Sequence, residues 1–265
     1  MLKKILSIVL AVVMIVSVAA FATSCGNTAG DNNSETTVAD NKANDGKEFK
    51  VGFIFLHDEN STYDLNFINA VKGAQAATGL TDSQVIMKTN IPEGQECYEA
   101  CEDLVDQGCS LIFADSFGHE TYLIEAAKKY TDVQFCHATG TRAHTEGLSN
   151  YHNAFASIYE GRYLAGVAAG LKLNEMIANG DFTAEQAVIG YIGAYTYAEV
   201  VSGYTSFFLG ARSVCPTATM KVQFTGSWYD EAMEKEAANA LIAQGCKLIS
   251  QHADSMGAPT ACEMA

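Results

Sequence analysis

The sequence predicts an α/β fold with parallel sheets, divided between two lobes of similar topology. From residue 49 onward, short apolar runs alternate with amphipathic helical stretches, and polar or aromatic turns lie between them. A continuous apolar run is typical of a buried parallel strand, and regular alternation of strand and helix predicts a parallel sheet. The segments LVDQGCSLIFADSFG and LIAQGCKLISQHADS repeat a helix, a glycine and a strand, which predicts two lobes.

The first lobe is expected at residues 49–152. Apolar runs predict its strands, at 49–56, 84–88, 111–114 and 133–137, with a shorter strand at 148–151. The stretches between them have a helical period and predict helices at 63–77, 92–107 and 120–130. Leu65, Ile68 and Val71 mark the inner face of the first helix, and Gly108 supplies the left-handed residue that ends the second.

The second lobe is expected at residues 153–265. It begins with a long helical stretch at 155–177, after which the alternation resumes. Strands are predicted at 187–192, 219–224 and 247–250, and helices at 198–213 and 230–244. The chain ends within a further expected helix and with too few strands for a complete second sheet. We therefore expect the C-terminal part of this lobe to be missing.

The N-terminus predicts an export signal. Residues 1–4 are basic, residues 5–22 are apolar or small, and Cys25 follows the small residues ATS. This arrangement resembles the lipobox of bacterial lipoproteins, although Ala22 stands where that motif usually carries leucine. We expect residues 1–24 to be a lipoprotein signal peptide and Cys25 to be the lipid anchor. The alternative is an uncleaved membrane anchor, because the apolar run is long enough to span a bilayer.

Residues 25–48 are predicted to form a flexible tether. They are rich in Asn, Asp, Thr, Gly and Ala, and Val38 is their only large aliphatic residue. Such a segment cannot bury enough apolar surface to fold. A tether behind a lipid anchor predicts a globular domain held close to the outer face of the cell membrane.

The charge and the cysteines exclude several classes of function. Acidic residues outnumber basic ones by 31 to 16, and the formal net charge of −15 disfavours nucleic acid as a partner. Cys97 and Cys101 lie one helical turn apart, but no His or Cys pair with matching spacing completes a metal site, so we expect no metal. The other cysteines downstream of the tether lie in or beside apolar runs and are expected to be small buried hydrophobic residues: Cys109, Cys136, Cys215, Cys246 and Cys262.

The sequence lacks the common motifs of nucleotide-binding and hydrolytic enzymes. No G-x-G-x-x-G follows the first strand, and neither a Walker loop nor a G-x-S-x-G elbow occurs. The histidines are scattered and most fall in predicted turns, so we expect solvated or capping roles for His57, His119, His137, His144, His152 and His252. No enzymatic activity and no cofactor are predicted.

Aromatic and carboxylate side chains gather after the ends of the predicted strands. In open α/β sheets, ligands bind beyond the carboxyl ends of the strands. Aromatic faces and carboxylates suit a planar heterocycle or a polyol and do not suit an anion. The alternative is that the carboxylates cap helices and the rings belong to the core. The candidate ligand-binding residues are Asp58, Tyr63, Asp64, Asp115, Ser116, Phe117, Tyr195, Tyr197, Trp228 and Asp254.

Several segments resemble the basic membrane protein (BMP) family, the PnrA-like substrate-binding lipoproteins of ABC transporters. They include LIFADSFG, FCHATGT, YEGRYLAGVAAG, FFLGARSVCPTATMKV, GSWYDEAMEKEAANALIAQGC and ISQHADS. The resemblance implies a type I periplasmic-binding-protein fold, with two Rossmann-like lobes joined by a hinge. It also implies a purine nucleoside or base as ligand, clamped by aromatic rings and held by Asp or Asn side chains.

The resemblance assigns roles to individual positions. Tyr63 and Asp64 stand where the family has the aromatic residue and the Asn of its first loop, and Asp115 stands where it has an acidic or polar residue. Tyr195 lies in the loop that supplies the opposing ring, and Trp228 matches an aromatic residue of the next loop. The first loop lacks the family's Asp-Lys-Ser-Phe-Asn sequence, and the family's late Asp-bearing strand is missing beyond residue 265.

The expected function is that of an extracytoplasmic, lipid-anchored binding protein. We expect a monomer that captures a purine nucleoside or base and delivers it to an ABC transporter permease. Three alternatives stay open: a sugar or autoinducer receptor on the same fold, a ligand sensor for a membrane signalling protein, and an enzyme.

Overall fold

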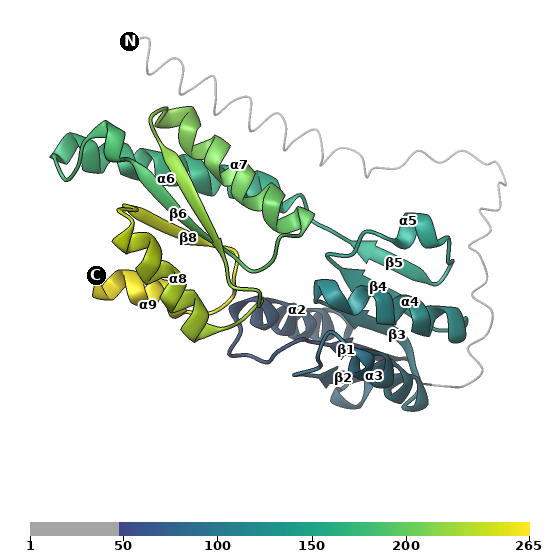
Figure 1. Cartoon of the computed structure of the whole chain (residues 1–265). Coiled ribbons are helices and arrows are strands. Elements are labelled where there is room, and N and C mark those ends of the chain that lie inside the picture. Colours follow the sequence, from purple (N-terminus) through teal and green to yellow (C-terminus); the bar gives the residue numbers. More distant parts are fainter. Residues whose placement is uncertain (1–47) are drawn as a thin grey trace, which may run out of the picture. The chain divides into compact units, whose positions relative to one another are not determined.

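Five parallel strands form the first sheet in the computed structural model, which describes residues 48–265 (Figure 1). They are β1 (Lys50–Ile54), β2 (Val85–Lys88), β3 (Cys109–Ala114), β4 (Gln134–Ala138) and β5 (Tyr151–Ala154), in the order β2-β1-β3-β4-β5. The order reverses at β1, because β2 pairs with one side of it and β3 with the other. Such a reversal is where open α/β sheets form a ligand crevice.

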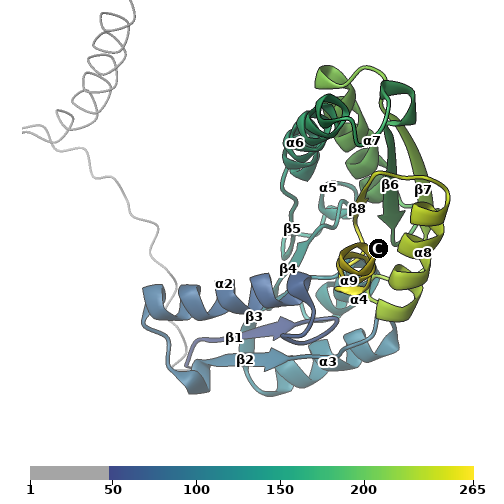
Figure 2. The ribbon, with the colours of Figure 1, turned by 90° about the vertical axis from the view of Figure 1, so that its left-hand side faces the viewer.

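The helices of the first lobe cover both faces of this sheet. Figure 2 shows α2 (Thr62–Thr78) on one side of β1 and α3 (Gln95–Asp106) on the other. Helix α4 (Glu120–Lys129) shares the core with α3, and the short α5 (Ala143–Glu146) lies before β5.

Local sequence sets the ends of these helices. Ser61 caps α2 by accepting a hydrogen bond from the Asp64 N–H, and Gly79 ends α2 in the left-handed conformation. Gly108, with φ of 89°, follows α3 as predicted.

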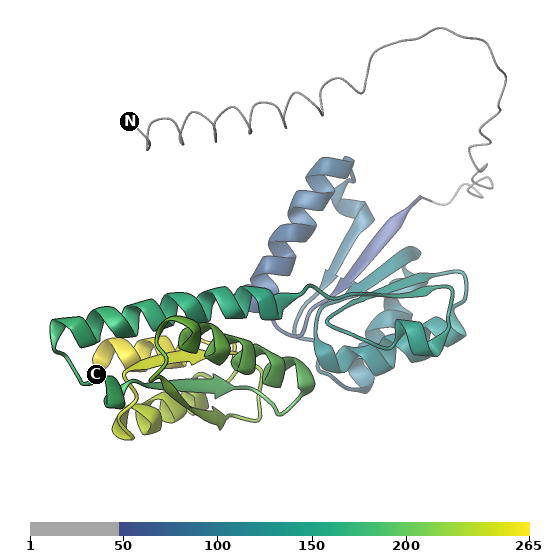
Figure 3. The ribbon, with the colours of Figure 1, turned by 90° about the horizontal axis from the view of Figure 1, so that it is seen from above.

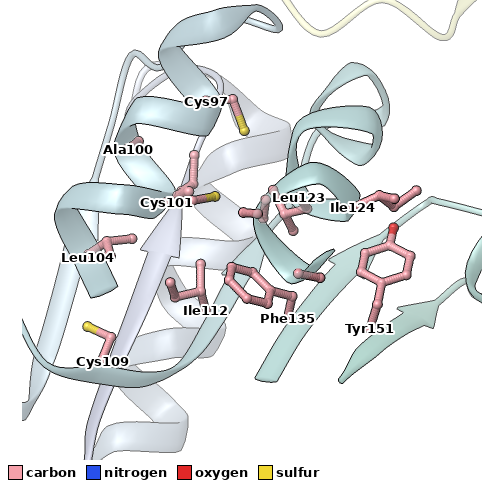
Figure 4. Close-up of a cluster of buried hydrophobic side chains, with 14 residues drawn as sticks. Cys97, Ala100, Cys101, Leu104, Cys109, Ile112, Leu123, Ile124, Phe135 and Tyr151 are labelled. Atoms are coloured by element: carbon pink, nitrogen blue, oxygen red, sulfur yellow. The ribbon is translucent and has the colours of Figure 1, made fainter. Parts of the chain in front are cut away.

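The main core of the first lobe lies between the sheet and the helices α3 and α4. Cys97, Cys101 and Cys109 pack there among aliphatic and aromatic side chains, including Leu104 and Phe135 (Figure 4). The prediction of buried cysteines is also confirmed for Cys215 and Cys246 in the second lobe. Cys136 is only half-buried, and the prediction was wrong for Cys262, which is exposed near the end of the last helix.

Three parallel strands form the second sheet, with a helix pair on each face. The strands β6 (Val188–Gly193), β7 (Thr219–Phe224) and β8 (Leu248–Gln251) lie in the order β7-β6-β8. Ile189 and Tyr191 share a core with α6 (Ile158–Asn179) and α7 (Ala198–Val214), the two longest helices of this lobe (Figure 3). Ile192 points to the opposite face and packs with α8 (Glu231–Ala243) and α9 (Gly257–Met264).

Most element boundaries agree with the predictions to within a few residues, but the strand predicted at 148–151 lies at 151–154. The reason is Asn150, whose side-chain amide donates to the main-chain oxygens of Ala127, Tyr130 and Val133. It fixes the turn after α4, and the ladder with β4 begins at the next residue. Three short 3₁₀ helices were not predicted: η1 (Asp82–Gln84), η2 (Phe117–His119) and η3 (Ala184–Gln186).

None of the helices among residues 48–265 is long and apolar enough to cross a membrane. The predicted signal peptide and Cys25 lie outside the described residues, as does the tether apart from residue 48.

Candidate functional site

A small cavity lies beyond the carboxyl ends of the strands and is lined from both lobes. Its volume is about 30 Å³, which is room for about two water molecules. The lining side chains are mainly aromatic or acidic: Leu56, Tyr63, Asp64, Ser116, Phe117, Thr139, Glu199, Trp228, His252 and Asp254.

An aromatic cluster joins the two lobes at this cavity. The ring of Phe117, just after β3, stacks on that of Tyr197, before α7, with centroids 5.0 Å apart and planes 28° apart. Tyr195 stacks on Tyr197 at 5.0 Å and meets Trp228 edge-on at 5.1 Å. The rings therefore contact one another in this structure, although aromatic faces of this kind can hold a planar ligand.

Asp64 lies in the first turn of α2, and neighbouring groups already hold its carboxylate. Its oxygens accept hydrogen bonds from the His57 N–H at 2.9 Å and from the Ser61 hydroxyl at 2.6 Å. The His57 ring nitrogen Nδ1 lies 3.4 Å away. These contacts outweigh the effect of burial and lower the pKa of Asp64, whereas the hydrogen bond to Asp64 raises the pKa of His57. Asp64 therefore carries a negative charge at the first-lobe wall.

Asp115 is fully buried directly after β3. Its Oδ1 accepts a long hydrogen bond of 3.4 Å from the Leu56 N–H, and its Oδ2 has no partner within the described chain. Burial and the nearby Asp64 charge raise the pKa of Asp115 well above its ordinary value. Its main-chain oxygen accepts a hydrogen bond of 2.8 Å from the Tyr63 hydroxyl.

The second-lobe wall carries Asp254, Glu199 and His252. His252 Nε2 lies 3.6 Å from Glu199. Burial, with the charges of Asp64 and Glu234, raises the pKa of Asp254 to about 7. The lobes also meet through a hydrogen bond of 3.2 Å from the Thr62 hydroxyl to the main-chain oxygen of Asp254.

Hydrogen bonds to the Glu93 and His137 side chains fix the loop that carries Ser116 and Phe117. Glu93 accepts hydrogen bonds from the Ser116 hydroxyl at 2.6 Å and from the Gly118 N–H at 2.7 Å. Burial lowers the pKa of His137 to about 4, so its ring is neutral near pH 7, and Nε2 donates to the Ser116 main-chain oxygen at 2.6 Å. The hydrogen bonds on either side of Phe117 therefore fix the main chain that carries its ring.

Residues 55–263 match the model of the family described as ABC transporter substrate-binding protein PnrA-like. The chain belongs to this family. The resemblance seen in the sequence is therefore confirmed, and so is the predicted α/β fold of the periplasmic-binding-protein type. Substrate-binding proteins of this family are extracytoplasmic and in general are not enzymes.

Two curated relatives are similar over much of the chain. A purine-binding protein of Brucella abortus is 37% identical over 215 residues, which are 80% of this chain and 56% of the relative. A putative ABC transporter glucose-binding protein of Haloferax volcanii, TsgA13, is 40% identical over 148 residues, 56% of this chain and 34% of the relative. This chain thus spans about half the length of the first of these relatives and about a third of the second.

The fold is similar to that of solved solute-binding proteins. An ABC transporter solute-binding protein from Conexibacter woesei has a TM-score of 0.60 at 19% identity, over 81% of this chain and 67% of that one. At this identity, the likeness concerns the fold alone.

The structure brings most of the predicted site residues of this PnrA-like chain to one place. Six of them line the cavity: Tyr63, Asp64, Ser116, Phe117, Trp228 and Asp254. Tyr195 and Tyr197 contact Phe117 or Trp228 in the aromatic cluster, and Asp115 is buried beneath Tyr63. Asp58 does not line the cavity, because its carboxylate is used within its own turn by the N–H and side chain of Asn60.

Four lining residues were missed, namely Leu56, Thr139, Glu199 and His252. Each lies one to two residues after a strand or in the first turn of the following helix, so the same strand-end rule could have found them. The prediction of solvated or capping histidines was wrong for His119, His137 and His252, which are buried. The rings of His119 and His137 lie against the main-chain oxygens of Ile91 and Ser116, and the ring of His252 lies beside Glu199.

Metal sites are built from sets of His, Cys, Asp or Glu ligands. Among residues 48–265, no three His, Cys, Asp or Glu side chains gather as metal ligands would. The chemistry that the cavity offers is recognition by rings, carboxylates and hydroxyls.

Proposed function

We propose that the protein captures a purine nucleoside or base between its two lobes and delivers it to the permease of an ABC importer. The observation that carries this proposal is the aromatic contact across the lobes, in which Phe117 from one lobe faces Tyr197 from the other at 5.0 Å. Two rings that face each other from separate lobes are suited to hold a flat heterocycle between them. The name of the Brucella abortus relative, a purine-binding protein, supports the same ligand class.

The polar groups favour a neutral ligand over a phosphorylated one. Asp64, Glu199 and Asp254 line the cavity, and no Lys or Arg side chain does. Carboxylates accept hydrogen bonds from ribose hydroxyls and from amino groups, but they repel phosphate. A nucleoside or a free base therefore fits the charge of the site better than a nucleotide.

Binding requires the aromatic cluster to open. The cavity of about 30 Å³ is too small for a purine. A base inserted between two rings needs their planes about 7 Å apart, which is two van der Waals spacings. We expect the Phe117 and Tyr197 rings to separate as the ligand enters, and ligand contacts from both lobes then favour the closed form.

We also propose that the protein works at the outer face of the cell membrane. After removal of the predicted signal peptide, Cys25 would anchor it by lipid to the outer face of the cell membrane, with residues 25–48 as the tether. It would act as a monomer and catalyse no reaction.

A sugar is the second candidate ligand. It is favoured by the relative TsgA13, a putative glucose-binding protein that is 40% identical over 148 residues. Carboxylates and aromatic faces also bind sugars, so the lining of the cavity alone does not separate the two classes.

Trp228 provides the experiment that separates them. It is the only tryptophan of the chain and lines the cavity, so its fluorescence reports on the site. Adenosine is expected to quench this fluorescence saturably, and a large excess of glucose should leave the adenosine curve unchanged. Saturable glucose binding that displaces adenosine, or that occurs without adenosine binding, would assign the site to sugars.

A further inference from the structure

Thr139 has a backbone conformation that its side chain disfavours. It directly follows β4 and has a φ of 68°, in the left-handed region. For a β-branched residue this is a genuine outlier, because the side chain crowds the main chain there. Strained conformations of this kind persist only where the surroundings enforce them, and they cluster at functional sites.

Thr139 lines the cavity, and its hydroxyl is buried without a hydrogen-bond partner among the described residues. The residue lines both the small cavity and an adjoining hollow of about 610 Å³, whose other walls include α2 and the segment that follows β5. Its Oγ1 is buried, and no group within residues 48–265 forms a hydrogen bond with it. The main-chain N–H of Thr139 donates to the Ala154 main-chain oxygen at 3.1 Å, so only the hydroxyl of this residue lacks a partner among its donors. A buried hydroxyl without a partner is unfavourable, so its placement requires an explanation.

Glu120 enforces the conformation. One oxygen of this buried side chain accepts from the N–H groups of Thr141 and Arg142, both at 2.8 Å, and from the Tyr151 hydroxyl at 3.1 Å. Gly140 packs so closely against this group that an added Cβ would lie 2.5 Å from the Glu120 oxygen. These contacts fix residues 140–142 directly after the strained Thr139.

We propose that the Thr139 hydroxyl is a hydrogen-bonding contact of the bound ligand, presented to it by the strained backbone that Glu120 holds. This inference rests on the proposed function, in that the cavity is a ligand site. A hydroxyl donates one hydrogen bond and accepts others, so it suits a ring nitrogen or a hydroxyl group of a neutral heterocycle or nucleoside. Thr139 would thus add a specificity-determining contact from the first lobe, next to the rings.

The test compares three substitutions at this residue in the full chain. Thr139→Val keeps the shape and the strain but removes the hydroxyl, and adenosine affinity is expected to fall five- to tenfold, with an unchanged midpoint of thermal unfolding. Thr139→Gly removes both the hydroxyl and the strain, so affinity should fall at least as far while the midpoint is unchanged or higher. Thr139→Ser retains the hydroxyl and should lose less than threefold. Thr141→Val, at an exposed position of the same loop, is the control and should bind as the wild type does.

The outcomes separate this inference from the proposed function. If the wild type binds adenosine and Thr139→Val binds it equally well, the role of Thr139 is overturned while the purine ligand stands. If the wild type binds glucose but not adenosine, the purine proposal fails, and the same comparison with glucose decides the role of Thr139. A lower unfolding midpoint for Thr139→Val with unchanged affinity would show a structural role and overturn the inference.

Discussion

The Tyr63 hydroxyl donates a hydrogen bond of 2.8 Å to the main-chain oxygen of Asp115. This bond joins the first turn of α2 to the end of β3, so Tyr63 and the nearby Phe117 keep fixed positions relative to each other. The ring of Tyr63 is thereby held as a wall of the cavity.

Tyr63→Ala is expected to lower ligand affinity at least tenfold, because it removes this wall. Tyr63→Phe loses only the hydrogen bond, so it should bind nearly normally and lose about 1 kcal/mol of unfolding free energy. Fluorescence titration and urea unfolding measure the two effects. Tyr159→Ala, a half-exposed tyrosine at the start of α6, is the control. Equal affinities for Tyr63→Ala and wild type would remove Tyr63 from the site.

The raised pKa of Asp254 predicts a pH-dependent stability. Its pKa is about 7 in the folded chain against an ordinary 3.8, so between these values the folded state binds a proton that the unfolded state has lost. Stability therefore falls as the pH rises from about 4 to 7. Asp254→Asn removes this contribution and should be more stable than wild type at pH 7. Partial solvation of the carboxylate reduces the gain to roughly 1–2 kcal/mol.

Urea unfolding at pH 4 and pH 7 measures the effect of Asp254→Asn. The difference between variant and wild type should be small at pH 4 and should grow toward pH 7. Asp115 also has a raised pKa, so the variant is expected to keep part of the pH dependence. A constant difference at both pH values would contradict the assignment to Asp254.

The strand-end rule predicted that residues from separate strands lie close together, because parallel strands share one carboxyl edge. The structure places Ser116 and Phe117 at the same cavity as Asp254, which lies far from them in the sequence. Asp58 does not line this cavity, and the sequence pattern does not show whether a carboxylate faces a cavity or accepts hydrogen bonds from its own turn.

Thr139 could not have been predicted in the same way. Its strained φ depends on the Glu120 carboxylate, which reaches the 139–142 loop from another element. His252 was missed because burial of a histidine depends on packing between elements that sequence periodicity does not specify. The boundary of β5 depends likewise on the hydrogen bonds that the Asn150 side-chain amide donates to three main-chain oxygens.

Removal of the Glu120 carboxylate is expected to destabilise the first lobe. Glu120→Ala leaves the N–H groups of Thr141 and Arg142 and the Tyr151 hydroxyl without their acceptor. We expect a loss of about 3 kcal/mol in the free energy of unfolding. Glu125→Ala, on the exposed side of α4, is the matched control and should change it by less than about 0.5 kcal/mol. Similar unfolding curves for the two variants would show that the Glu120 contacts contribute little.

The contact between α6 and α7 requires glycine at its centre. A Cβ at Gly166 would lie 1.9 Å from the main-chain oxygen of Phe207, so Gly166→Ala must push the helices apart. We expect it to destabilise the second lobe by about 3 kcal/mol. A Cβ at Gly161 on the same helix would meet no atom within 4 Å, so Gly161→Ala should stabilise by about 0.5–1 kcal/mol. Thermal unfolding of both variants gives the comparison, and an unaffected Gly166→Ala would contradict the close packing.

Calorimetric titration of the chain with adenosine tests the central claim most directly. We expect one saturable site with a dissociation constant below about 10 µM, and Tyr197→Ala should weaken it at least tenfold by removing one of the two facing rings. A folded wild-type chain that gives no saturable heat with adenosine, or a Tyr197→Ala variant that binds as tightly as wild type, would contradict capture of a purine between the two lobes.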